Sequence, residues 1–242
     1  DRQTLAEQVA PHLGQRRRHG RAHTDLPARL FRQPRRVARL RHVTDYNGYV
    51  PNRPTGQWFT SHDGHRWWFD SGALSLDFAY TGAMGDNPAW EQLRGAEDLA
   101  AWLHERFEDV DGTVSEGDLR DALALRGAIA SAVSSVGHGR DAPPEAIDVI
   151  NLFAATPDIP PSLAGGTRQA GRTRARASQA LSEMARETVA LLTGGHDRFR
   201  ECFADDCALV FYDESRSNNR RWCSMQRCGN RAKVRAHRAK LR

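Results

Sequence analysis

Apolar residues at helical spacing dominate the middle of the chain, from about residue 95 to residue 195. A first stripe, at positions i, i+3, i+4 and i+8, consists of Leu99, Trp102, Leu103 and Phe107. The sequence Ser-Glu-Gly-Asp at 115–118 is typical of an N-terminal capping box. A second stripe follows it and ends at Gly137, with members Leu119, Ala122, Leu123, Ile129, Ala130 and Val133. Both patterns predict amphipathic helices.

Prolines and glycines mark the ends of two further predicted helices. Pro143-Pro144 opens one helix and Pro157 closes it. Its expected inner residues are Ile147, Ile150 and Ala154. The other helix runs from about Thr173 to Thr193 and ends at Gly194-Gly195. Its expected inner residues are Ala177, Leu181, Met184 and Leu191.

The folded part is expected to begin near Trp67. A short apolar run at 72–78 fits either a strand or the start of a buried helix, because its periodicity does not distinguish them. Residues 66–197 are therefore predicted to form a mainly α-helical domain that senses a ligand or dimerises. Residues 1–65 are rich in arginine and poor in apolar periods, so we expect a disordered basic extension. A basic arm that contacts phosphates is the alternative interpretation.

Charge divides the chain into three parts. Residues 1–60 hold 12 arginines and 4 acidic residues, and residues 61–214 hold 13 arginines and 26 acidic residues. Residues 215–242 hold 10 arginines and lysines and no acidic residue. An acidic body with a basic end is typical of a protein that contacts phosphates through that end alone. No apolar stretch is long enough for a membrane span or a signal peptide, so we expect a cytoplasmic protein without a membrane partner.

All four cysteines lie close together near the C-terminus. Cys202 and Cys207 form one Cys-x4-Cys pair and Cys223 and Cys228 form another, with 15 residues between the pairs. Paired cysteines a few residues apart supply two thiolates from one turn, and Zn²⁺ requires four ligands in a tetrahedron. The spacing predicts a four-cysteine zinc site, with two disulfides as the alternative that an intracellular location disfavours.

The residues between the cysteine pairs predict a hairpin that leads into a helix. The run 209–212 is a strand candidate, 217–219 is a turn that tolerates the left-handed conformation, and 220–222 is the expected return strand. Cys228 is expected in the first turn of the final helix, and His237 lies well into that helix on its surface. Residues 198–242 are therefore predicted to form a small treble-clef-like ββα zinc finger.

The final helix carries a row of cations that predicts binding of nucleic acid. Arg231, Arg235, Arg238 and Arg242 fall at i, i+4, i+7 and i+11, on one face. Val234 and Leu241 are expected to pack rather than touch DNA. The nucleic-acid contacts are predicted at Arg216, Arg220, Arg221, Asn230, Arg231, Lys233, Arg235 and Arg238.

Three sequence blocks in this region resemble the CGNR zinc finger family. They are Phe-Tyr-Asp-Glu-Ser-Arg at 211–216, Arg-Arg-Trp-Cys-Ser-Met at 220–225 and Cys-Gly-Asn-Arg-Ala-Lys at 228–233. The upstream part resembles the helical domain that precedes this finger, whose motif Leu-Asp-Phe-Ala-Asn-Thr is here Leu-Asp-Phe-Ala-Tyr-Thr at 76–81. The resemblance covers about residues 66–242. It implies a zinc-dependent DNA-binding transcription regulator that is not an enzyme.

A small-molecule effector pocket is a candidate in the helical domain. Its expected residues are Asp77, Phe78, Tyr80 and Arg126. Arg126 lies on an otherwise apolar helix face, where it could equally form a structural pair with Asp77.

The partners expected from these patterns are double-stranded DNA, a small-molecule effector and a second copy of the chain. Three alternatives remain open at this point. One is an RNA-binding zinc protein, and another is a small-molecule enzyme in which the finger is a structural clip. The third is a finger whose basic tail meets an acidic protein.

Overall fold

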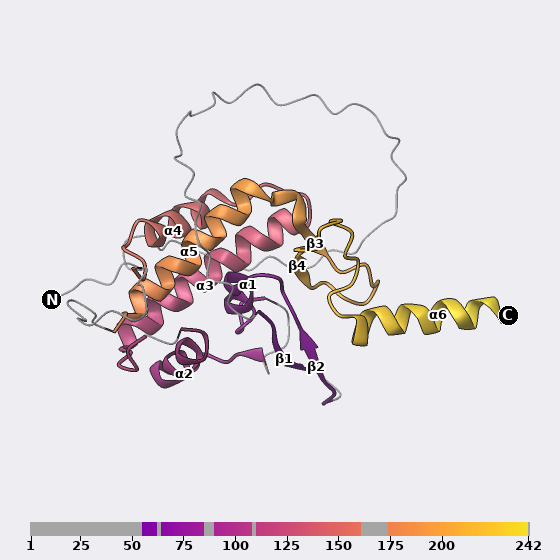
Figure 1. Cartoon of the computed structure of the whole chain (residues 1–242), viewed down its shortest axis with the longest axis horizontal. Helices are drawn as coiled ribbons and strands as arrows, with labels where there is room; N and C mark the ends of the chain where they lie inside the picture. Colours follow the sequence, from indigo (N-terminus) through magenta and orange to yellow (C-terminus); the bar gives the residue numbers. More distant parts are fainter. Residues whose placement is uncertain (1–54, 62–63, 85–89, 108–109, 161–173, 242) are drawn as a thin grey trace, which may run out of the picture. The chain divides into compact units, whose positions relative to one another are not determined.

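The computed structural model describes residues 55–61, 64–84, 90–107, 110–160 and 174–241 (Figure 1). The expected basic extension lies, over residues 1–54, outside the described residues. The folded part begins upstream of Trp67, because β1 (Gln57–Thr60) pairs antiparallel with β2 (Arg66–Phe69). The first residues of the domain therefore include a strand that we had placed in the extension.

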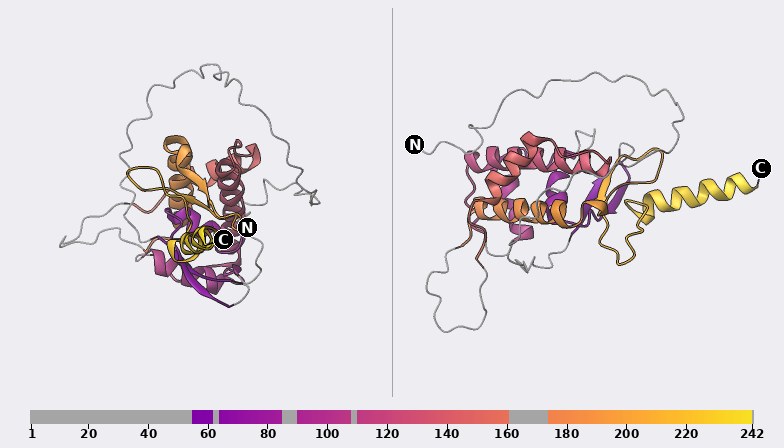
Figure 2. Two further views of the ribbon diagram at one scale, coloured as in Figure 1. Left: turned by 90° about the vertical axis from the view of Figure 1, so that its right-hand side faces the viewer. Right: turned by 90° about the horizontal axis from the view of Figure 1, so that it is seen from above.

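The body of the molecule is helical, as predicted. Its elements after the hairpin are α1 (Leu74–Ala79), α2 (Ala96–Arg106), α3 (Glu116–Gly137), α4 (Pro144–Ala154) and α5 (Ala177–Gly194). Helices α3, α4 and α5 pack against one another, and Figure 2 shows them side by side in both views. None of the helices in the described part combines the length and the apolar character that a membrane crossing requires.

Local sequence sets the ends of the long helices. The Ser115 hydroxyl accepts the backbone N–H of Asp118, and the Asp118 carboxylate accepts the N–H of Ser115, so the predicted capping box is present. Pro144 occupies the first turn of α4, where no hydrogen bond from its nitrogen is needed. Helix α5 begins at Ala177, later than the predicted Thr173, and the oxygen of Gln179 accepts the N–H of Arg176 there.

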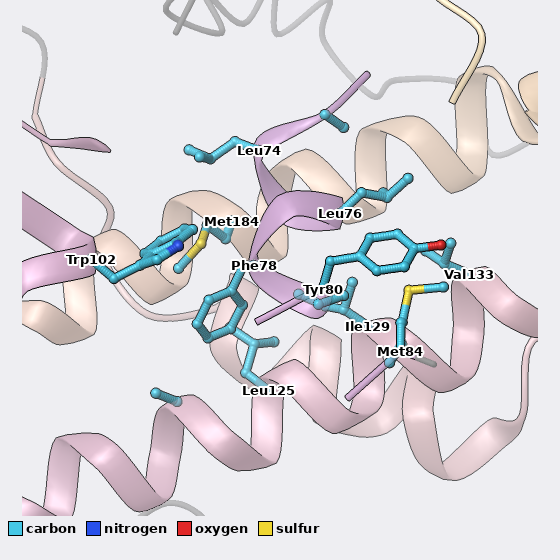
Figure 3. Packing of buried hydrophobic residues seen from close by; sticks show 14 of the residues in the cluster. Leu74, Leu76, Phe78, Tyr80, Met84, Trp102, Leu125, Ile129, Val133 and Met184 are labelled. Carbon is cyan, nitrogen blue, oxygen red and sulfur yellow. The ribbon is translucent and has the colours of Figure 1, made fainter. Parts of the chain in front are cut away.

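The short helix α1 lies at the centre of the body, and all six of its residues are buried. Figure 3 shows Phe78 directed toward Leu125 of α3, while Tyr80, just after α1, points toward Val133. The ambiguous run at 72–78 is thus helical, because Glu187 of α5 accepts the N–H groups of Leu74 (3.4 Å) and Ser75 (2.6 Å). A carboxylate from a distant helix caps α1, which no local pattern could reveal.

One predicted core position is wrong. Ile147 is 40% exposed, whereas Ala146, Ile150 and Phe153 of α4 are buried. These three residues fall at i, i+4 and i+7 and face α3 and α5, so Ile147 lies at the edge of the contact.

After α5, a short 3-10 helix (His196–Arg198) leads into the finger, which begins with a small antiparallel sheet. Its strands are β3 (Phe199–Glu201) and β4 (Val210–Tyr212), and its helix is α6 (Asn230–Lys240). Strand β4 confirms the predicted strand, and Asn218 has the left-handed φ of 44° that the predicted turn requires. The expected return strand at 220–222 is wrong, because β3 pairs with one edge of β4 and the helical body occupies the other.

Candidate metal centre and finger surface

The structure brings all four cysteines together, and their sulfur atoms lie within 4.8 Å of one another. Cys202 and Cys207 flank a tight loop that follows β3, in which the N–H of Cys202 donates to Leu209 O and that of Cys207 to Ala204 O. Cys223 directly follows the irregular segment at 220–222. Cys228 lies in a single π-helical turn, Met225–Gly229, immediately before α6.

The spacing of the sulfur atoms fits a tetrahedral zinc ion. The Sγ atoms of Cys207 and Cys223 are 3.7 Å apart, and those of Cys223 and Cys228 are 3.5 Å apart. Zinc–sulfur bonds of about 2.3 Å place the corners of a tetrahedron about 3.8 Å apart. A disulfide requires about 2.05 Å, and all four cysteines are free. The donor set therefore fits Zn²⁺ and does not fit the alternative of two disulfides.

Neighbouring N–H groups compensate the negative charge that four thiolates bring to such a site. The backbone N–H of Cys223 donates to the sulfur of Cys202 at 3.4 Å, and the Arg231 guanidinium donates to the sulfur of Cys228 at 3.3 Å. Cys202, Cys223 and Cys228 are buried, and Cys207 is partly exposed. A divalent ion with four thiolates keeps a charge of −2, so these donors stabilise the loaded site.

Hydrogen bonds among the four thiols shift their pKa values in opposite directions. The hydrogen bond with Cys207 is the main cause that lowers the pKa of Cys202, and the hydrogen bond with Cys202 is the main cause that raises the pKa of Cys223. Opposite shifts within one cluster show that its negative charges compete. A metal ion held by Cys202, Cys207, Cys223 and Cys228 would displace the thiol protons, so that all four sulfurs could be thiolates at once.

A buried carboxylate organises the loop between β4 and the second cysteine pair. Asp213 accepts the backbone N–H groups of Ser215 (2.9 Å) and Arg220 (2.7 Å), and Arg200 lies 3.8 Å from it. Burial opposes the ionised form, but the hydrogen bonds with Ser215 and Arg220 outweigh it and lower the pKa of Asp213. Asp213 therefore shapes the finger and does not face a ligand.

The edge of β4 that does not pair with β3 is hydrogen-bonded to the helical body. The Tyr80 hydroxyl donates to Val210 O and accepts the N–H of Val210, both at 2.8 Å. The N–H of Tyr212 donates to Ser71 O at 2.8 Å. Gly72 permits this approach, because a Cβ there would lie 2.2 Å from Tyr212 O. The finger is consequently built onto the body through backbone hydrogen bonds.

Two arginines of the finger also contact the body. The Arg220 guanidinium lies 4.2 Å from the ring centroid of Phe211 and donates to the carbonyls of Asp70 and Cys223. The Arg227 guanidinium lies 4.7 Å from the ring centroid of Trp67 in β2. Arg220 is among the residues predicted to contact nucleic acid, but its guanidinium donates to carbonyl groups within the protein.

The remaining predicted nucleic-acid residues fall into two groups. Arg231 and Arg235 each lie 3.0 Å from the carboxylate of Asp206, which neutralises part of their charge. The second group is exposed and consists of Arg216, Arg221, Asn230, Lys233 and Arg238. Asn230 directs its side-chain amide to Gln226 O at 3.4 Å.

Val234 of α6 and Leu241, which directly follows α6, do not pack as expected. Val234 is 49% exposed and Leu241 is 75% exposed, and none of the residues of α6 is buried. His237 is exposed as predicted. The helix contacts the finger through its first turns, where Asp206 holds Arg231 and Arg235.

The candidate effector residues mostly form the core of the body. Asp77 accepts the N–H of Gly56 and the hydroxyl of Ser71, both at 2.6 Å. Arg126 does not pair with Asp77; it binds both carboxylate oxygens of Glu91, at 2.7 and 2.8 Å. Asp77 and Arg126 are both buried, and each has separate partners, so the pair that the sequence suggested does not form.

Two cavities lie elsewhere in the described part. The larger, of about 430 Å³, lies between the β1–β2 hairpin and α2 and is lined by residues that include Trp58, Trp68, Trp90, Trp102 and Arg106. Trp58 and Trp68 pair across the hairpin on its exposed face. Along each strand, exposed residues alternate with buried ones, and this alternation is the sequence signal that could have located the two tryptophans. The smaller, of about 340 Å³, is bordered by Tyr80 and Cys207.

Comparison with known families agrees with this geometry. The CGNR zinc finger model matches residues 198–240, which include all four cysteines. The ABATE model, whose description reads "Putative stress-induced transcription regulator", matches residues 72–195, which include α1 to α5. A comparison with curated proteins gave no match. The chain therefore belongs to the ABATE family of transcription-regulator-like proteins and carries a CGNR zinc finger after its helical domain.

Proposed function

We propose that this protein is a zinc-dependent transcription regulator that binds double-stranded DNA through its finger and α6. Cys202, Cys207, Cys223 and Cys228 hold Zn²⁺ in this proposal. The ion fixes the π-helical turn that leads into α6, and α6 then presents its cations to phosphates. The helical domain receives the signal that the regulator transmits.

The observation that carries the proposal is the unbalanced charge of an exposed helix. Helix α6 has five cationic residues, no acidic residue and no buried residue. Asp206 balances only Arg231 and Arg235, at its first turns. Lys233, Arg238 and Lys240 have no carboxylate partner among the described residues. The positive charges of such a helix repel one another in water, and a bound polyanion reduces this repulsion.

Paired charge variants test the DNA contact without disturbing the metal site. In Lys233→Gln/Arg238→Gln, two exposed cations of α6 are lost. We expect duplex binding at 0.1 M salt to weaken by roughly 10- to 60-fold. The slope of log K against log salt should become less steep by about 1.8, since each phosphate contact contributes about 0.9. Fluorescence anisotropy across a salt series measures both quantities.

The matched control is Arg120→Gln/Arg140→Gln, which removes the same charge from exposed positions of the acidic body. It should leave affinity and slope within about twofold of the original chain. Equal losses in both variants would show that only net charge matters, which contradicts the proposal. Competition between duplex DNA and structured RNA separates the DNA-binding regulator from the RNA-binding alternative.

We further propose that the cavity of about 430 Å³ is the effector site of the helical domain. Its volume and its indole-rich lining suit a flat apolar molecule. Glu105 and Arg106 place one negative and one positive charge at its wall, and Arg106 also donates to Gly56 O. This site replaces the four residues suggested by the sequence, of which only Tyr80 borders either cavity.

The fluorescent anion 8-anilinonaphthalene-1-sulfonate is a suitable probe for this cavity. Saturable binding of one molecule per chain is expected, with at least tenfold weaker binding in Trp68→Ala. Ile147→Ala serves as the control, because Ile147 is an exposed apolar residue outside the cavity. Equal binding by both variants would place the probe elsewhere and would refute the assignment.

A further inference from the structure

Two aromatic residues flank the metal ligands on the surface of the finger. Phe203 directly follows Cys202 and is 64% exposed, and Trp222 directly precedes Cys223. Their ring centroids lie 5.8 Å apart with an interplanar angle of 78°. Each ring is therefore attached one residue away from a proposed metal ligand.

An arginine packs against both rings. The Arg221 guanidinium carbon is 4.4 Å from the ring centroid of Phe203 and 5.3 Å from that of Trp222. The N–H of Phe203 donates to Arg221 O at 2.9 Å, which joins the two loops at this point. Phe203, Arg221 and Trp222 together form what we call the stacking ridge. Phe203 and Arg221 are exposed, while Trp222 is partly buried.

The stacking ridge is held next to the cations of α6. Phe203 belongs to the same tight loop as Asp206, and Asp206 pairs with Arg231 and Arg235 of α6 at 3.0 Å. Arg238 lies further along the face of α6 that carries Arg231 and Arg235, and it has no carboxylate partner among the described residues. A nucleic-acid strand whose phosphates contact Arg238 therefore runs along the side of α6 that faces this loop. The loop of Phe203 itself carries the exposed Asp205 and Asp206, of which Asp206 is paired with α6. Residues 215–242, which include Arg221 and α6, hold 10 cationic and no acidic residues, so a polyanion complements that side of the ridge.

We propose that the stacking ridge binds an unstacked or unpaired DNA base, with Phe203 as the residue on which the base stacks. This inference rests on the proposed DNA binding and makes it more specific. Aromatic rings beside arginine are the usual platforms for exposed bases, and apolar wedges of this kind open base steps in bent duplexes. The protein should then prefer DNA with an opened step over a regular duplex.

The test uses the full zinc-loaded chain and three DNAs of one length: a regular duplex, a duplex with a two-base bulge, and a single strand. The original chain should bind the bulged duplex more tightly than the regular one. Phe203→Ala should lose about 5- to 150-fold on the bulged duplex, the range expected for one stacked base, and less than twofold on the regular duplex. Phe203→Trp should retain the preference.

A second readout separates stacking from general affinity. A 2-aminopurine placed in the bulge should change its fluorescence on binding to the original chain and to Phe203→Trp, but not to Phe203→Ala. Zinc content and circular dichroism should stay unchanged in both variants, because Phe203 is largely exposed.

The possible outcomes distinguish this inference from the proposed function. If the original chain binds regular and bulged duplexes equally, or if Phe203→Ala keeps the preference, the stacking role is refuted and DNA binding stands. If no DNA binds, both proposals fail. Binding of an acidic peptide at the ridge that displaces no DNA would also refute the stacking role.

Discussion

At the scale of single residues, the buried carboxyl group of Asp77 makes the stability of the fold depend on pH. Burial raises the pKa of Asp77 from 3.8 to about 7, and the hydrogen bonds from Ser71 and Gly56 only partly oppose this shift. The unfolded chain loses the proton near pH 4, while the folded chain keeps it up to about pH 7. Its contribution to stability is therefore complete below about pH 4 and declines as pH rises toward 7.

The variant Asp77→Asn should remove this decline. The Ser71 hydroxyl lies 2.6 Å from Asp77 and also 2.9 Å from Ala73 O, to which it can donate instead. The amide of the variant can then donate to the Ser71 oxygen, while its own oxygen accepts the N–H of Gly56. We expect stability close to that of the original chain at pH 4 and a gain on the order of 4 kcal/mol at pH 8. Urea unfolding at several pH values measures the difference. A difference that does not vary with pH would refute the assignment, and the exposed Asp148→Asn is the control.

At the scale of elements, sequence patterns sufficed where contacts are local. The stripe and capping box of α3 predicted its position, and cysteine spacing predicted that the four cysteines form one cluster. Strand pairing in the finger was missed, because the edge of β4 is bound by Tyr80, 130 residues away in sequence. A return strand at 220–222 has no free edge to join.

Distant contacts also decided which arginines are available to a ligand. The charge pattern treated the finger's arginines as equivalent, but Arg220 donates to Asp70 O, 150 residues away in sequence. Arg231 is shared between Asp206 and the sulfur of Cys228. Helical periodicity specifies on which face a cation lies. It contains no information on the carboxylate or carbonyl that folds against that face.

At the scale of the whole molecule, Tyr80 joins the finger to the helical body. Tyr80→Phe would leave the buried N–H and C=O of Val210 without their partner, at a cost of about 2–4 kcal/mol. In the original chain, chelation of zinc should lower the melting temperature of the helical signal, since the finger supports the body through β4. The effect of chelation should be smaller in Tyr80→Phe, because the two parts are then less tightly joined.

Circular dichroism at 222 nm with and without a zinc chelator measures this coupling, since most of the described helical residues lie in α2 to α5. Tyr212→Phe is the control, because the described residues provide no hydrogen bond to its hydroxyl. A melting temperature that does not respond to chelation in the original chain would show that the body folds independently of the finger.

Because the body makes hydrogen bonds to β4, the finger is not expected to fold properly when it is separated from the body. A fragment cut at residue 198 would expose the N–H and C=O of Val210 and the N–H of Tyr212, together with the apolar side chains around them. An unprotected strand edge of this kind invites pairing between copies. Grafting the finger onto another protein as a separate cassette should therefore yield aggregates, unless the acceptor supplies a hydroxyl and a carbonyl at the same places.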